Sequence, residues 1–128
     1  MVKKLNQRVK QDTKGHTVLT GFILLEVCKT KLPHEGRTAN LTGRQINECR
    51  EEDLAYFKML EFLDLSDNNC ELNWFKTLPS LKEIDLSHNS IHSVQLDSGY
   101  FTKLLVLHLN FNQVPSNDIM KLSNIPRL

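Results

Sequence analysis

The chain has 128 residues, 40% of them hydrophobic, and a formal net charge of +1. These values are typical of one folded domain with a modest core, and they exclude a chain that is disordered throughout. A net charge near zero gives no general attraction to nucleic acid or to an anionic membrane surface.

The first fifteen residues differ from the rest in charge. They hold five bases, one acid and few side chains that could anchor a core, so we expect residues 1–15 to form a mobile basic tail. Such a tail suits a solvated terminus, a contact with an acidic polymer, or a contact with an acidic protein surface such as that of tubulin. It has no aromatic residues between its charges, so nucleic-acid binding is not favoured. The bases are Lys3, Lys4, Arg8, Lys10 and Lys14.

An apolar run follows at residues 17–28. It is too short to span a bilayer and lacks the small-residue cleavage pattern that ends a secretory signal. We therefore expect a protein that stays inside the cell and does not enter a membrane. The run suits either a strand or a helix with Val18, Phe22 and Leu25 on one face, and it is the expected cap of the N-terminal end.

Residues 36–46 hold a weak copy of a pattern that becomes strong later. Ala39, Leu41 and Ile46 keep its apolar positions. Gly36 takes the first position, and Arg44 stands where asparagine is expected. We interpret this segment as a degenerate first repeat, followed at residues 50–59 by a short helix. The apolar residues of that helix are Leu54, Phe57 and Met59.

Three windows, residues 60–70, 81–91 and 104–114, share one spacing of residues. Each fits L-x-x-L-x-L-x-x-N-x-(apolar), and the asparagines lie 21 and then 23 residues apart. This is the period of a leucine-rich repeat. We predict an α/β leucine-rich-repeat solenoid with a short parallel sheet on its concave face and irregular or helical returns on its convex face. Residues 16–59 would be the cap and degenerate repeat, and residues 60–128 the three full repeats.

The repeated asparagine occupies an interior position of an otherwise apolar pattern. The two apolar residues before it alternate with exposed ones, as in a strand with one buried face. After the strand the buried chain must turn, and its free N–H and C=O groups need partners. An amide side chain both donates and accepts, so we predict that Asn68, Asn89 and Asn112 are stacked structural residues.

The C-terminal return has a more helical pattern than the others. Ser116 or Asn117 is placed to cap a helix. Leu128 stands where a fourth repeat would begin, so we expect further chain or another molecule to cover that edge. The apolar side of the helix would hold Ile119, Leu122 and Ile125.

The exposed strand positions would form the concave face, the usual binding surface of such repeats. They are acidic in the first two full repeats and more apolar in the third. A partner with a basic segment beside an apolar anchor would fit this surface; an ordinary solvated face is the alternative. The predicted partner-binding residues are Phe62, Asp64, Glu83, Asp85, Val106, His108 and Phe111.

Catalytic and metal chemistry have little support. Asp64, Asp85 and His108 fall in one column on neighbouring strands, but a shallow open face lacks the surrounding shell that metal and catalytic sites need. The three cysteines lack zinc-site spacing, so we expect free thiols, with Cys70 buried and inert. No glycine-rich phosphate loop or hydrolase motif is present. We predict no enzyme, no cofactor and no metal.

The runs FKTLPSLKEIDLSHNSI and YFTKLLVLHLNFNQV, with GHTVLTGFILLEVC far upstream, resemble the family of X-ray radiation resistance-associated proteins, which are intracellular leucine-rich-repeat proteins. By pattern the resemblance covers residues 15–128. It implies a non-enzymatic protein of the nucleus or cytoplasm, and it makes this chain a short relative, an isoform or a fragment of longer proteins. Related intracellular leucine-rich-repeat proteins serve as axonemal and ciliary scaffolds.

Two functions remain open at this point. The preferred one is an intracellular adaptor that binds a protein partner on the concave face. The alternative is a structural component of a larger assembly, such as the doublet microtubule of a ciliary axoneme, with tubulin or axonemal proteins as partners. Neither function involves a small-molecule substrate, nucleic acid or a membrane.

Overall fold

A computed structural model describes residues 16–128, so the expected basic tail, residues 1–15, lies outside the described part. The secondary-structure elements are short. In chain order they are the strand β1 (Thr17–Leu19), the helix α2 (Gly21–Cys28), the 3-10 helix η1 (Pro33–Glu35), β2 (Thr38–Asn40), β3 (Ile46–Cys49), α3 (Glu51–Leu54), β4 (Phe62–Asp64), η2 (Leu72–Phe75), β5 (Glu83–Asp85), β6 (Val106–His108), α4 (Ser116–Ile119) and η3 (Met120–Asn124).

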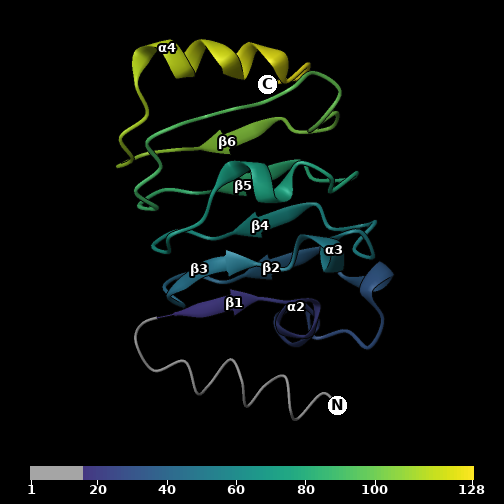
Figure 1. The fold of residues 1–128 in the computed structure, drawn as a ribbon. Coiled ribbons are helices and arrows are strands. Elements are labelled where there is room, and N and C mark those ends of the chain that lie inside the picture. Colours follow the sequence, from purple (N-terminus) through teal and green to yellow (C-terminus); the bar gives the residue numbers. More distant parts are fainter. Residues whose placement is uncertain (1–15) are drawn as a thin grey trace.

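Four strands form one parallel sheet in the order β2-β4-β5-β6, and Figure 1 shows them stacked in chain order. Corresponding repeat positions pair: Leu63 lies beside Ile84, and Ile84 beside Leu107. This register follows from the two-residue period of the sequence, because a slip by one residue would turn each of these side chains to solvent. The parallel strand expected in each repeat is therefore present, and the fold is mixed α/β.

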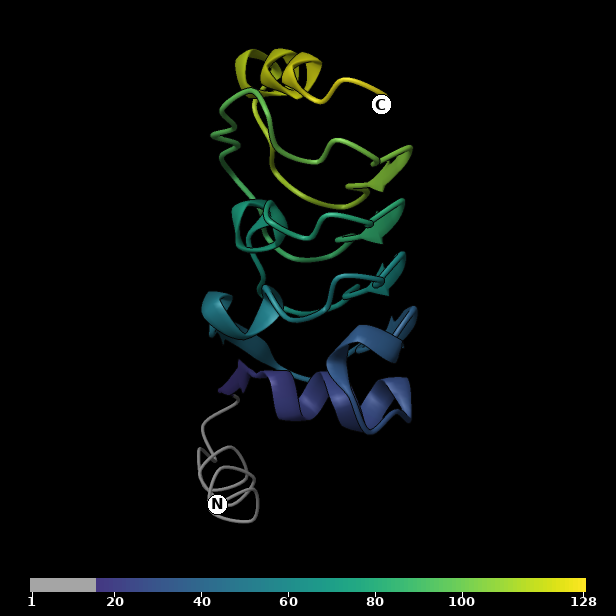
Figure 2. The same ribbon diagram turned by 90° about the vertical axis from the view of Figure 1, so that its right-hand side faces the viewer.

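One continuous core lies behind this sheet. The first leucine of each sequence window is buried, and the returns close the core with Phe75 and Phe101, which are at most 2% exposed. Figure 2 shows the returns on the side of the molecule opposite the four-stranded sheet. We call one strand with its return a coil; each coil buries its apolar side against its neighbours. The three leucines are Leu60, Leu81 and Leu104.

The repeated asparagines lie at the turns after the strands and join neighbouring coils. The Asn68 amide donates to the Leu41 C=O of the preceding coil (2.9 Å), and its Oδ1 accepts from the Ile46 N–H (3.0 Å). Asn89 and Asn112 repeat this arrangement, each donating to a carbonyl one coil earlier. From that earlier coil, Asn89 accepts one N–H group and Asn112 accepts two. The amides therefore supply the hydrogen bonds that the turning backbone lacks.

The run at residues 17–28 is both strand and helix. It forms β1, which pairs with β3 in a second, two-stranded parallel sheet, and then α2. Thr20 caps the helix, since its Oγ1 accepts from the Ile23 N–H (3.3 Å). The break at Thr20 leaves Val18 in β1, outside the helix, so the core face expected from a single helix is wrong. The buried side chains are Leu19, Ile23 and Leu24, while Val18, Phe22 and Leu25 are half-buried.

The short helix expected between residues 50 and 59 is α3, which buries Leu54. Met59, the last apolar residue of the expected helix, lies outside α3 and is 37% exposed, because the chain leaves the helix before this position and turns toward β4. Upstream, the Arg44 side chain does not replace a stacked asparagine; the Arg44 backbone N–H instead donates to Asn68 Oδ1 (2.9 Å).

No helix within residues 16–128 has the length and apolar content that a membrane crossing requires.

The last return is helical, in α4 and η3, but the expected cap is wrong. Pro115 precedes the helix, and neither Ser116 nor Asn117 makes a capping hydrogen bond. Asp118 anchors the helix instead, since its Oδ2 accepts from the Val94 N–H of the preceding return (3.0 Å). The helix tightens from α to 3-10 form along this segment, so its side chains do not keep one α-helical phase. Ile125 is buried and Leu122 half-buried, whereas Ile119 is 51% exposed, against expectation.

Candidate interaction surface

We call the outward side of the four-stranded sheet the open sheet face. Its side chains alternate along each strand with the inward-pointing ones. The strand register aligns them in two rows, one on each side of the inward row. One row is Thr38, Phe62, Glu83 and Val106, and the other is Asn40, Asp64, Asp85 and His108.

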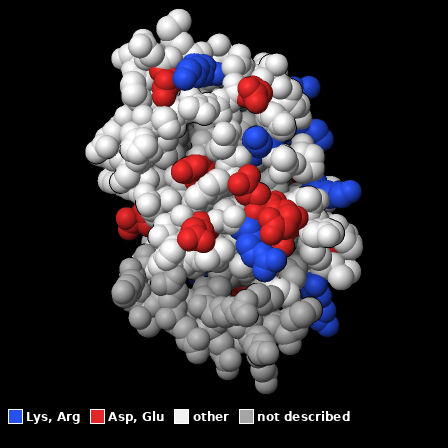
Figure 3. Space-filling view, in the orientation of Figure 1, with Lys and Arg blue, Asp and Glu red and all other residues white. Residues whose placement is uncertain are grey.

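The open sheet face is acidic. Three of its eight side chains are carboxylates and none is lysine or arginine, although the whole chain has a net charge of +1. Asp64 Oδ1 accepts from the N–H (3.0 Å) and hydroxyl (2.7 Å) of Ser66, and Asp85 Oδ1 accepts from the Ser87 N–H (2.9 Å). The second oxygen of each aspartate makes no hydrogen bond within residues 16–128. On the opposite side, seen in Figure 3, lysine and arginine lie among the acids.

His108 pairs with Glu83 of the neighbouring strand, with 2.9 Å between Nε2 and Oε2. This contact directs His108 toward the other row, away from the column that it shares in register with Asp64 and Asp85. The described part of the chain contains no group of three His, Cys, Asp or Glu side chains that could hold a metal ion. The aspartates act instead as acceptors in the turns after their strands.

Apolar side chains interrupt the acidic surface. Phe62 and Val106 lie in the same row and are 43% and 40% exposed. Phe111, which is 77% exposed, lies beyond the end of β6, where its ring stacks on His88 with 4.3 Å between centroids. Phe111 is therefore at the border of the open sheet face, on the turn side, and the other six predicted contact residues are on the face itself.

The open sheet face is hollowed beside β2. This hollow, of about 500 Å³, is lined by β2, β4 and β5 and by the C-terminal end of α2, which Figure 2 shows reaching this side of the molecule. The sequence analysis missed that α2 lines this hollow, because an apolar run interpreted as a single element does not show in which direction its helix points. The signal that could have found it is Thr20 followed by Gly21, a helix start inside the run. The residues contributed by α2 and its cap are Val27, Cys28 and Lys29.

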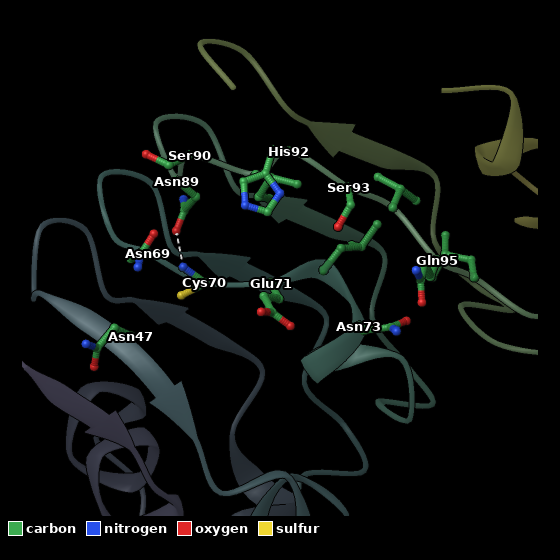
Figure 4. A pocket seen from close by; sticks show the side chains of 14 residues that line it. Asn47, Asn69, Cys70, Glu71, Asn73, Asn89, Ser90, His92, Ser93 and Gln95 are labelled. Atoms are coloured by element: carbon green, nitrogen blue, oxygen red, sulfur yellow. Dashed lines mark hydrogen bonds between the residues drawn. The ribbon is translucent and has the colours of Figure 1, made fainter. Parts of the chain in front are cut away.

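A second cavity, of about 320 Å³, lies on the return side between the coils that contain Asn68 and Asn89. Figure 4 shows amide and hydroxyl side chains around it. The two returns diverge because one turns into η2 while the next, longer by two residues, stays extended. Asn47 Oδ1 is buried beside this cavity without a hydrogen-bond partner in the described chain, and a polar cavity of this size has room for the water that such an atom needs. In the sequence, this cavity was signalled by the unequal spacing of the repeated asparagines, which are 21 and then 23 residues apart.

The three cysteines are free thiols. Burial raises the pKa of Cys28 and Cys70, and it raises that of Cys49 to about 12, where the carboxylates of residues 51–53 add to the effect. Because the thiolate is the reactive form, these thiols are poor nucleophiles near neutral pH. They add no catalytic group to the surface.

Three known proteins are similar to this chain in sequence. X-ray radiation resistance-associated protein 1 of Mus musculus is 32% identical over 128 residues, which cover 99% of this chain and 16% of that protein. The resemblance inferred from the sequence is confirmed. Toll-like receptor 2 of Cricetulus griseus is 30% identical over 96 residues, 75% of this chain and 12% of the receptor. Leucine-rich repeat serine/threonine-protein kinase 1 of Caenorhabditis elegans is 38% identical over 72 residues, 52% of this chain and 3% of the kinase.

The chain thus spans about a sixth or less of the length of these relatives. No family model matches it, and no solved structure matches it. The similarities agree with the three sequence windows in identifying leucine-rich repeats. Stacked repeats of this kind present extended surfaces to protein partners.

Proposed function

We propose that the chain is a leucine-rich-repeat solenoid that acts as a non-enzymatic adaptor, with the open sheet face as its concave binding surface for a protein partner. The exposure of Phe62 and Val106 supports this proposal most directly, since every other apolar side chain of the four strands is buried or half-buried. Exposed apolar groups gathered beside charged ones are a common mark of protein interfaces. An intracellular setting, in the cytoplasm or nucleus, belongs to the same proposal.

Partner capture with a variant of the open sheet face tests this function. Phe62→Ala combined with Asp85→Lys removes one apolar anchor and reverses one charge. The matched control, Tyr56→Ala with Glu71→Lys, makes the same chemical changes at exposed positions away from the face. With the full chain immobilised, we expect a set of proteins that the wild type and the control retain and the face variant loses. Equal capture by all three chains would exclude the open sheet face as the binding surface.

A structural role in a larger assembly, with tubulin or axonemal proteins as neighbours, is the second candidate. The feature in its favour is the last coil, where Leu105, Ile119 and Met120 are 52%, 51% and 76% exposed. An assembly component would need neighbours to cover these side chains. Sedimentation of the isolated chain separates the candidates: a stable monomer supports the adaptor, and solubility only with neighbours supports the assembly.

A further inference from the structure

We propose that the hollow beside β2 receives one lysine or arginine side chain of the partner. This inference rests on the proposed function, because it gives the chemistry of the segment that the open sheet face would bind. Its physical basis is the combination of two carboxylates, a helix C-terminus and an apolar wall within a single hollow of about 500 Å³.

The carboxylates supply the charge complementarity. Asp64 and Asp85 are partners in the register of β4 and β5, and adjacent strands lie about 4.8 Å apart. Each keeps one oxygen that makes no hydrogen bond within the described residues, so one cation between them can contact both. Glu83 also lines the hollow but already pairs with His108. Among protein side chains, lysine with its ammonium group and arginine with its guanidinium group can donate hydrogen bonds to two free carboxylate oxygens.

The C-terminal end of α2 adds to the negative electrostatic potential that the carboxylates create in the hollow. Backbone carbonyls at a helix C-terminus carry partial negative charge, and α2 ends at Cys28, in the wall of the hollow. Lys29, which follows directly in a left-handed conformation (φ 57°), is the one lysine or arginine among the lining residues. Because like charges repel, we expect Lys29 to oppose the entry of a second cation.

The wall also offers apolar surface for the stem of a long basic side chain. Val27 and the half-exposed ring of Phe62 line the hollow beside the acids. Lysine and arginine place their methylene groups along such surface while the charged head reaches a polar group. A small inorganic cation would leave this surface exposed, so the arrangement favours a side chain over an ion.

The test uses two peptides of the same size and the full chain. One peptide is Gly-Leu-Gly-Arg-Gly-Leu-Gly, and the other carries citrulline, the uncharged analogue of arginine, at the same position. Titration followed by NMR amide shifts gives both affinities. We expect the arginine peptide to bind more tightly by about twofold to thirtyfold, the range that two exposed ion pairs provide.

Variants of the hollow locate the effect. Asp64→Asn with Asp85→Asn should abolish the difference between the peptides, and asparagine keeps the Oδ1 acceptor that Ser66 and Ser87 need for their turns. Lys29→Gln should strengthen binding of the arginine peptide. The control, Glu71→Gln with the exposed Asp97→Asn on the return side, should change neither affinity.

Equal affinities for the two peptides, failure of the arginine peptide to bind, or an arginine preference that survives in the doubly substituted chain would each overturn the inference. Partner capture distinguishes this failure from that of the proposed function. If capture still depends on Phe62 and Asp85 while the arginine preference is absent, the open sheet face binds partners of different chemistry. If both results are negative, the proposed function fails as well.

Discussion

Asn89 shows why a polar residue is required inside an apolar pattern. It is 1% exposed, its Oδ1 accepts from the Cys70 N–H (2.7 Å), and its amide nitrogen donates to the C=O groups of Leu65 (2.9 Å) and Ser87 (3.1 Å). A leucine would continue the apolar pattern but would satisfy none of these groups. The residue type at this position is determined by the hydrogen bonds that the buried backbone groups need, and not by hydrophobicity.

The variant Asn89→Leu should therefore lower the free energy of unfolding by about 1–3 kcal/mol, the cost of leaving buried polar groups unpaired. Urea denaturation measures this loss. Asn69→Leu is the matched control, because Asn69 is exposed and its side chain makes no hydrogen bond in the described structure. We expect the control to change stability by less than about 0.5 kcal/mol. Equal losses in both variants would contradict a structural role for the stacked amides.

Thiol reactivity gives a second prediction for single residues. Burial raises the pKa of Cys49 and Cys70, so both should stay protonated near neutral pH and react slowly with a chromogenic disulfide reagent in the folded chain. In urea the same thiols should react quickly. Variants that keep one cysteine each, with serine at the other two positions, assign the rates. Labelling of Cys70 as fast in the folded chain as in the unfolded chain would show that this coil opens readily.

Among the elements, α4 depends on a contact with another part of the chain. Asp118 accepts from the Val94 N–H and pairs with Lys121 (3.0 Å), and these contacts, the N–H first, lower its pKa below the ordinary value of 3.8. Folding therefore favours the ionised carboxylate. The resulting stability is fully present above pH 3.8 and is lost as the pH falls through the lower pKa of the folded chain.

We expect Asp118→Asn to lose less stability than the wild type when the pH is lowered from neutral to below 3.8. Denaturation with urea at the two pH values gives the comparison. Asp97→Asn is the control, since this exposed carboxylate has no hydrogen bond or ion pair in the described structure, and it should behave like the wild type. An identical acid loss in Asp118→Asn and the wild type would show that the Val94 contact does not anchor α4.

The same contact explains what the sequence could and could not predict. Strand positions and register were predictable, because the two-residue period and the asparagine spacing leave only one face for Leu63 and Ile84. The anchor of α4 was not, since local rules favour a cap at Ser116, whereas Asp118 bonds to a residue 24 positions earlier. Likewise the hollow depends on where α2 ends in space, and the apolar run alone does not give that position.

At the scale of the whole molecule, the two ends of the stack of coils differ in how completely other parts of the chain bury them. The sheet edge at β2 is packed against α2, whose Leu24 is fully buried, whereas beyond β6 Leu122 is only half-buried and Met120 is exposed. In a stack of coils each unit is stabilised mainly by its neighbours. Stability should therefore decrease toward the C-terminal end.

Hydrogen exchange of the folded chain tests this asymmetry. We expect the slowest amides in β4 and β5, intermediate rates in β2, and the fastest sheet amides in β6. Leu24→Ala, which should cost about 2–5 kcal/mol, should raise the exchange rates of β2 selectively. Ile119→Ala, at an exposed site at the opposite end, should leave β2 unchanged. Uniform rates along the sheet would contradict the asymmetry.

The parallel pairing also has a consequence for biosynthesis. Each strand of the four-stranded sheet after β2 pairs with one that lies 21 to 24 residues earlier in the chain, as in Leu63 with Ala39 and Ile84 with Leu63. A ribosome adds about 5–20 residues per second, so the partner of each strand emerges within roughly 1–5 seconds. A nascent chain can therefore add its coils in order of translation, beginning on the α2 end, and no strand has to wait for a distant partner.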